Sequence, residues 1–172
     1  MRFAVFTVSL PEWTPEEAVR YLAEAGYDGV EWRIADDAPR ATPGFWAGNR
    51  CTIPLRGVVE DAPRMRALTE AAGLETPAAG SYVQAADAEN VERVLLGAAA
   101  LGGKMARIQV PGYDGRSAFL PLWEQTRRDY QAVERVARAH GVKALVEIHH
   151  GTIVPSASAE NFRKSRREIV IF

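Results

Sequence analysis

The segment ALVEIHHGT, residues 144–152, joins an apolar run to a glutamate, two histidines and a glycine turn. Strands of parallel sheets are apolar because both of their faces are covered, and such proteins carry their functional groups just beyond the carboxyl ends of the strands. We therefore predict that this segment is a buried strand that delivers active-site residues to the edge of a sheet.

The same order of elements recurs before this segment. Helical periodicity, a glycine and a strand-like apolar run follow one another four times, and the glycines are Gly26, Gly73, Gly102 and Gly141. Glycine ends helices because it adopts the left-handed backbone conformation without a steric penalty. Helices and strands that alternate this regularly are typical of parallel strands joined by right-handed crossovers. The sequence therefore predicts an α/β fold.

The expected elements follow from periodicity and from helix-start signals. Thr14, Pro15 and Glu17 form a capping box with proline at the first helical position. Residues 35–59 lack a sustained period and are predicted to be a loop with a short hairpin over 51–59; Trp46 within it either covers a substrate or packs on its own loop. We expect strands at residues 3–8, 29–34, 76–82, 105–110 and 144–149, and helices at 15–25, 61–72, 88–101 and 117–140.

Two parallel architectures compete, an open doubly wound sheet and a closed barrel. The glycine-rich dinucleotide and phosphate-binding motifs that would follow the first strand of the open sheet are absent. A complete barrel has eight strand-helix units and typically about 250 residues. We therefore predict an incomplete (β/α)8 TIM barrel of about five units over residues 1–159, and the tail over 160–172 is expected to end in a sixth strand at 168–172.

Composition excludes several functional classes. The 172 residues are 47% hydrophobic and 25% charged, which indicates a globular chain. The formal net charge of -1 provides no field for nucleic acid or an anionic membrane, so neither is an expected partner. Cys51 is the only cysteine, and the apolar run near Met1 is too short for a signal peptide or a membrane span. A cytoplasmic location is therefore expected.

Side-chain alternation along three strands predicts which residues face the barrel interior. Neighbouring strand residues point to opposite faces, and the apolar set of each strand should meet the helices. The polar sets then meet at the active-site end. One interpretation is an internal layer of salt bridges, for example between Glu31 and Arg107; the other is a pocket for a hydroxylated ligand with a metal on Glu147. The inward set consists of Glu31, Arg33, Arg107, Gln109, Glu147 and His149.

Three segments, residues 25–31 (AGYDGVE), 108–112 (IQVPG) and 145–152 (LVEIHHGT), resemble the sugar phosphate isomerase/epimerase superfamily. These are xylose isomerase-like TIM barrels, which also include endonuclease IV-type repair enzymes. The resemblance implies a divalent metal, commonly manganese, magnesium, cobalt or zinc. It also implies that Glu147 is both a metal ligand and an acid/base carboxylate, and that Glu31 and His149 contact a sugar substrate together with the inward Arg107 and Gln109.

The sequence departs from this superfamily near its end. Members bring an Asp, a His and a second Glu to the metal from later strands, whereas residues 160–167 form a charged run with little apolar periodicity. A truncation, a frameshift or a crop of a longer chain would explain the difference. We therefore expect a metal that is weakly bound or absent, and weak or no catalysis.

Three functions are consistent with this pattern. The leading one is a metal-dependent sugar or sugar phosphate isomerase/epimerase that acts through an enediolate. A non-catalytic sugar-binding or partner-dependent fragment is the second. An abasic-site endonuclease is the third, and the net charge disfavours it. The open edges of an incomplete barrel also favour pairing with another chain, which would give a homo-oligomer.

Overall fold

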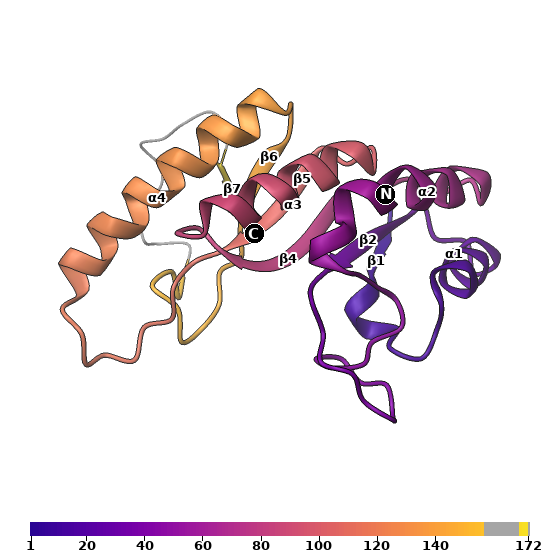
Figure 1. Ribbon diagram of the computed structural model, residues 1–172, viewed down its shortest axis with the longest axis horizontal. Coiled ribbons are helices and arrows are strands. Elements are labelled where there is room, and N and C mark those ends of the chain that lie inside the picture. The colour runs from indigo at the N-terminus through magenta and orange to yellow at the C-terminus, as the bar shows by residue number, and fades with distance from the viewer. Residues whose placement is uncertain (157–168, 172) are drawn as a thin grey trace.

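A curved parallel sheet organises the protein, shown in Figure 1 as a computed structural model that describes residues 1–156 and 169–171. Its strands follow the order β1-β2-β4-β5-β6-β7, and the short strand β3 pairs with β2 outside this order. All pairs are parallel. The strands are β1 (Ala4–Phe6), β2 (Gly29–Ile34), β3 (Thr52–Ile53), β4 (Ala78–Gln84), β5 (Met105–Gln109), β6 (Lys143–Val146) and β7 (Ile169–Ile171).

The α-helices provide the crossovers between neighbouring strands. They are α1 (Pro15–Glu24), α2 (Val58–Ala71), α3 (Ala88–Ala100) and α4 (Phe119–Ala139). Figure 1 shows them in chain order along the sheet, from α1 at the right-hand end to α4 at the left. Among the described helices, including the 21-residue α4, none combines the length and the apolar character that a bilayer crossing requires.

The predicted start and stop signals of the first helix are confirmed. The backbone N–H of Glu17 donates to the Thr14 hydroxyl, and the backbone N–H of Thr14 donates to the Glu17 carboxylate over 2.8 Å, which completes the capping box. Gly26 follows the helix with a φ of 79°, a conformation that side-chain-bearing residues rarely adopt. The local sequence therefore specifies both ends of α1.

Alternation in β2 sends its apolar side chains toward the helices. Val30, Trp32 and Ile34 are fully buried. The indole N–H of Trp32 donates to the Thr69 hydroxyl in α2 over 3.2 Å, which fixes the direction of this side chain. The opposite face of β2 therefore carries Glu31, away from the helix layer.

Two sequence predictions about element boundaries are wrong. No hairpin forms over residues 51–59: β3 pairs in parallel with β2, a 3-10 turn follows, and α2 begins already at Val58. The strand predicted over 144–149 ends at Val146. In both places the composition looked strand-like, but strand length is set by the neighbouring strands, and β6 pairs with β5 only from Lys143 to Leu145.

The predicted fold class is confirmed as an incomplete barrel. The sheet is parallel and helix-covered, and within the described residues it does not close, because β1 pairs only with β2 and β7 only with β6. The sixth strand predicted at the end of the chain is present as β7. The rest of the predicted tail, residues 160–168 and 172, lies outside the described residues.

Candidate active site

An ion pair joins β5 to the segment after β6. Arg107 Nη1 donates to Glu147 Oε2 over 2.9 Å, and Arg107 Nε donates to the Ser81 carbonyl of β4 over 3.1 Å. Side-chain exposure is 12% for Arg107 and 41% for Glu147. Arg107 Nη2 is buried and has no hydrogen-bond partner among the described residues. The guanidinium therefore holds Glu147 in place and retains a donor for another group.

Glu31 of β2 lies beside this pair and is half-buried. Burial raises the pKa of the Glu31 carboxyl, because removal from water disfavours its charged form; the positive Arg107 lowers this pKa, and the negative Glu147 raises it. The net shift is upward. Glu31 is therefore protonated more readily than an exposed glutamate, and it can then donate a hydrogen bond.

A cavity of about 430 Å³ opens between these residues on the face of the sheet that carries Glu31. This volume lies in the range of small-molecule sites, which combine an apolar lining with a few polar groups. The polar groups are the three charged side chains, and the remainder of the lining is apolar. The cavity is lined by Phe6, Glu31, Pro77, Ala78, Met105, Arg107, Leu145, Val146 and Glu147.

Gly80 in β4 makes room for the Glu31 side chain. A Cβ atom at this position would lie 2.9 Å from Glu31 Oε1 and 2.5 Å from the Phe6 ring, both closer than such atoms normally approach. Gly80 pairs in register with Arg33 and with Arg107 on the neighbouring strands. The missing side chain therefore permits the close packing of groups on this face of the sheet.

Tyr82 is a neighbour of the site that the sequence prediction missed. Its ring centroid lies 4.7 Å from the Arg107 guanidinium carbon and 5.3 Å from that of Arg33. The ring of Trp46, from the loop after β2, contacts Tyr82 edge-on with centroids 5.8 Å apart. Alternation places Tyr82 on the same face of β4 as Gly80, and this alternation was the signal that could have found it. Pro77 weakens the strand signal of this segment, because proline has no backbone N–H to donate to a sheet.

Arg33 belongs to a separate ion pair rather than to the cavity. Its guanidinium donates to both carboxylate oxygens of Asp37, over 2.7 and 2.8 Å, and to the Thr52 hydroxyl over 2.7 Å. Its side chain is only 3% exposed. The suggested salt bridge between Glu31 and Arg107 is also not the one that forms, because Arg107 pairs with Glu147.

Gln109 and His149 do not line the cavity. The Gln109 Oε1 atom is buried without a hydrogen-bond partner in the described part of the chain. His149 is exposed, its ring stacks on His150 with centroids 4.2 Å apart, and its Nδ1 lies 2.6 Å from the His150 carbonyl oxygen. Because β6 ends at Val146, strand alternation does not extend to His149, and substrate contacts by His149 and Gln109 stay predictions.

The described residues do not by themselves fit the predicted divalent metal. Among them, no group of three or more His, Cys, Asp or Glu side chains could hold one. The carboxylates at the cavity are Glu31 and Glu147, and Arg107 occupies an oxygen of the latter. Hard divalent cations take several oxygen ligands, and a guanidinium repels them. Metal binding by Glu147 therefore stays a prediction.

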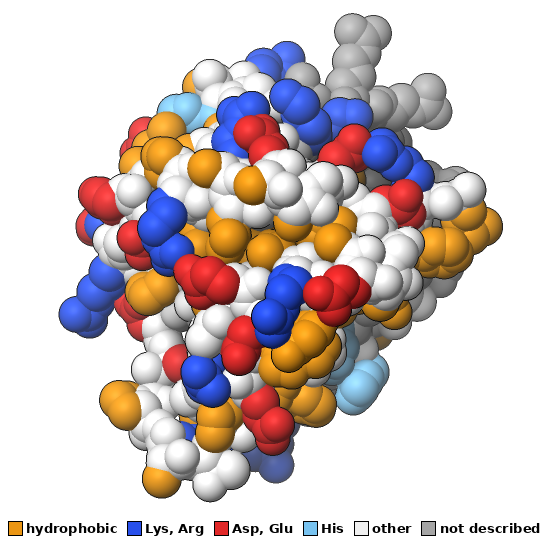
Figure 2. All heavy atoms as spheres, turned by 90° about the vertical axis from the view of Figure 1, so that its right-hand side faces the viewer, with side chains coloured by type: hydrophobic (Ala, Val, Ile, Leu, Met, Phe, Trp, Pro, Cys, Tyr) orange, Lys and Arg blue, Asp and Glu red, His pale blue; other side chains and the backbone are white. Residues whose placement is uncertain are grey.

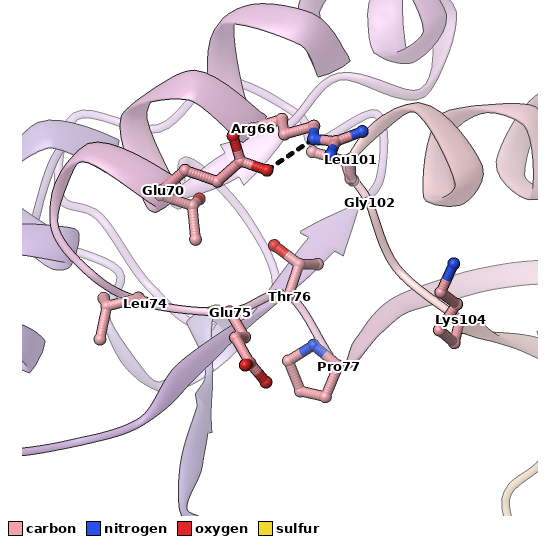
Figure 3. Close-up of a pocket in the computed structure, with 10 residues that line it drawn as sticks. Arg66, Glu70, Leu74, Glu75, Thr76, Pro77, Leu101, Gly102 and Lys104 are labelled. Atoms are coloured by element: carbon pink, nitrogen blue, oxygen red, sulfur yellow. Dashed lines mark hydrogen bonds and ion pairs between the residues drawn. The ribbon is translucent and has the colours of Figure 1, made fainter.

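A second hollow, of about 310 Å³, lies at the opposite ends of the strands, between the last turns of α2 and α3 (Figure 3). Three of its four charged side chains form ion pairs, and Lys104 is the fourth. Arg66 Nε donates to Glu70 over 2.7 Å, and Glu75 accepts from Arg2 over 2.8 Å. Barrel enzymes use the carboxyl ends of their strands, so we place the candidate site at Arg107 and Glu147 and not here.

Comparisons with known proteins show the fold. No protein-family model and no curated protein matches the sequence. Three solved structures superpose over 99% of the chain: 3-keto-D-glucoside 4-epimerase YcjR from E. coli (16% identity, TM-score 0.74), IOLI protein with a binding zinc atom (12%, 0.73), and AP endonuclease, family 2, from Brucella melitensis (18%, 0.70). The predicted resemblance to xylose isomerase-like barrels is therefore confirmed at the level of the fold.

The chain spans only part of these structures. It covers 67% of the epimerase chain, 62% of the IOLI chain and 67% of the endonuclease chain. Since identities below one fifth establish shared architecture and not shared chemistry, the activity of this chain has to be argued from its own side chains.

Proposed function

We propose that this chain carries part of the active site of a sugar isomerase or epimerase, with Glu147 as the proton-transferring carboxylate. The observation that carries the proposal is the joint placement of Glu31, Arg107 and Glu147 in one cavity at the active-site face of an incomplete barrel. Each comes from a different strand or strand end, as in barrel enzymes generally.

The proposed chemistry is proton transfer next to a carbonyl. Glu147 removes the proton from the carbon beside the sugar carbonyl, and the electron pair of that C–H bond moves into an enediolate. Arg107 Nη2 donates a hydrogen bond to the oxygen on which negative charge develops, and Glu31 does so when its carboxyl is protonated. Return of the proton from Glu147 to the neighbouring carbon, together with transfer of the hydroxyl proton to the former carbonyl oxygen, isomerises the sugar. Inversion of the same carbon would require a second proton donor on its opposite face.

The structural comparisons support this class of substrate. Enzymes that act on sugars occur among the similar folds, including the keto-glucoside epimerase. One protein of similar fold, IOLI protein, has a bound zinc atom. A metal at this site would polarise the same sugar carbonyl. Our proposal uses only the side chains of this chain for each proton transfer.

The endonuclease alternative is supported by the AP endonuclease among the structures of similar fold. Figure 2 shows the face at the right-hand end of Figure 1, where Lys and Arg side chains are interspersed with Asp and Glu. Nucleic-acid binding depends on phosphate contacts from clustered positive charge, and this one face carries mixed charge (Figure 2). Together with the formal net charge of -1, this makes the sugar proposal the main one.

Deuterium exchange tests the proposal directly. The chain is incubated with D-fructose, D-xylose or a keto-glucoside in D₂O, with and without Mn²⁺, and exchange beside the carbonyl is followed by NMR. We expect slow exchange with at least one sugar, reduced by about 100-fold or more in Glu147→Gln, because a positioned general base contributes roughly that factor. Equal exchange by the wild type and Glu147→Gln would exclude Glu147 as the base.

A further inference from the structure

We propose that Trp46 is the aromatic wall of the candidate site and determines which sugars it accepts. The inference rests on the proposed function, since it names the group that contacts the apolar face of the same substrate. Trp46 lies in the long loop between β2 and β3. It is not one of the three charged residues of the candidate site.

The base of this loop is fixed. Asp37 is held by the buried Arg33 guanidinium. At the other end, Asn49 donates from its side-chain amide to the Val8 carbonyl over 3.1 Å and accepts from the backbone N–H of Cys51 over 2.9 Å. Both ends of the loop are therefore anchored to the core, and the tip has a defined position.

The tip displays two large aromatic side chains to solvent. Gly44 N–H donates to the Ala47 carbonyl over 3.0 Å, which closes a tight turn around Phe45 and Trp46. Trp46 is 68% exposed and Phe45 is 53% exposed, whereas Trp32 and Trp123 are buried in the core. An indole that is mostly exposed on an anchored turn leaves an apolar surface that a ligand can cover.

A chain of contacts connects this indole to the charged groups. Trp46 meets the Tyr82 ring edge-on at 5.8 Å, that ring lies 4.7 Å from the Arg107 guanidinium carbon, and Arg107 pairs with Glu147. Tyr82 thus links Trp46 to Arg107. Neither ring is among the residues that line the cavity, so we infer that Trp46 lies beyond its rim, where a bound sugar would extend.

This arrangement matches the two faces of a sugar. A sugar presents C–H groups on one face, which pack favourably on an aromatic ring, and hydroxyl and carbonyl oxygens elsewhere, which hydrogen-bond to charged side chains. With its oxygens at Arg107 and Glu31, a sugar would turn a C–H face toward Trp46. The indole would therefore favour sugars whose C–H face is continuous.

Tryptophan fluorescence tests the inference, because Trp46 is the most exposed of the four tryptophans. D-Fructose, D-xylose and a keto-glucoside are titrated into the wild type, Trp46→Phe, Trp46→Ala and the control Trp13→Phe. The control alters a tryptophan whose ring contacts Tyr21 at a tilt, with centroids 4.8 Å apart. We expect a saturable emission change in the wild type and in Trp13→Phe, and none in Trp46→Phe.

Calorimetry supplies the affinity of each variant. Loss of the indole in Trp46→Ala should weaken sugar binding by roughly three- to tenfold, with Trp46→Phe in between, while the thermal midpoint stays that of the wild type because the side chain is exposed. Unchanged affinity in Trp46→Ala, or a wild type whose Trp46 emission answers to none of the sugars, would overturn the inference.

The two proposals fail separately. A saturable Trp46 signal without deuterium exchange would leave the aromatic wall in place and refute the proton-transfer function. Deuterium exchange that depends on Glu147 but does not change in the Trp46 variants would support the proton-transfer function and refute the aromatic wall. Glu147→Gln is expected to lose exchange and to retain the Trp46 signal.

Discussion

Arg107 and Glu147 lie 40 positions apart in the chain and form a hydrogen-bonded ion pair of 2.9 Å across the end of the sheet. Glu31 lies close enough to this pair that the charges of both residues affect the pKa of its carboxyl. The guanidinium therefore stabilises two carboxylates at once, and the balance among these three groups can be tested by substitution.

A double-mutant cycle on the pair measures its strength. Replacement Arg107→Met leaves Glu147 without its donor and should lower the free energy of unfolding by about 1–2 kcal/mol; a fully buried pair would lose more, but Glu147 is 41% exposed. Glu147→Gln should cost less, because the amide oxygen still accepts. Urea unfolding of both single variants and the double variant gives the coupling, expected near 1 kcal/mol. A coupling of zero would mean that the pair contributes nothing to the fold.

Substitution Glu31→Gln should change how stability depends on pH. The folded-state pKa of Glu31 is raised above its ordinary value of 4.5, so the folded chain binds more protons between these two values. The contribution of Glu31 to stability is therefore fully present below pH 4.5 and is lost as the pH rises through the raised pKa. We expect Glu31→Gln to unfold at a higher temperature than the wild type at pH 8, with an advantage that shrinks toward pH 4.

Glu24→Gln is the matched control for this measurement, because Glu24 is exposed at the end of α1. Its melts over the same pH range supply the baseline for an exposed glutamate-to-glutamine change. A Glu31→Gln difference that did not vary with pH would contradict the upward shift of the Glu31 pKa.

Gly80→Ala should disturb the candidate site. The added Cβ would come within 2.9 Å of Glu31 Oε1 and 2.5 Å of the Phe6 ring, so one of them must move at a cost of about 1–3 kcal/mol. Gly57→Ala is the control, since its nearest neighbour would lie 3.6 Å away. Thermal melts of both variants test the expectation, and deuterium exchange should fall in Gly80→Ala alone. A Gly80→Ala melt that coincides with the wild type would contradict the close packing.

The bond between β2 and α2 offers a test of the core. Thr69→Val removes the hydroxyl that accepts from the Trp32 indole N–H, and leaves this buried donor unpaired. We expect a loss of about 1–3 kcal/mol in unfolding free energy, whereas Thr69→Ser keeps the hydroxyl and should lose less. Chemical denaturation followed by tryptophan fluorescence and circular dichroism distinguishes them. Equal losses in the two variants would mean that the hydrogen bond contributes no more to stability than the methyl group that Thr69→Ser removes.

Much of the fold was predictable because it depends on local signals. The capping box of Thr14 and Glu17 and the glycines after the helices act within a few residues of the chain, and the structure contains each of them. Alternation in β2 likewise separated Glu31 from the buried Trp32, because a strand side chain's direction follows from its position alone.

The parallel fold, and the shared face of Glu31, Arg107 and Glu147, could be predicted from the sequence alone. The contacts of the site residues could not be predicted. Arg107 pairs with Glu147, Arg33 pairs with Asp37, β6 ends before His149, and the Trp46 ring contacts Tyr82. The physical reason is that strand length and ion pairing depend on neighbours distant in the chain, which alternation and periodicity do not contain.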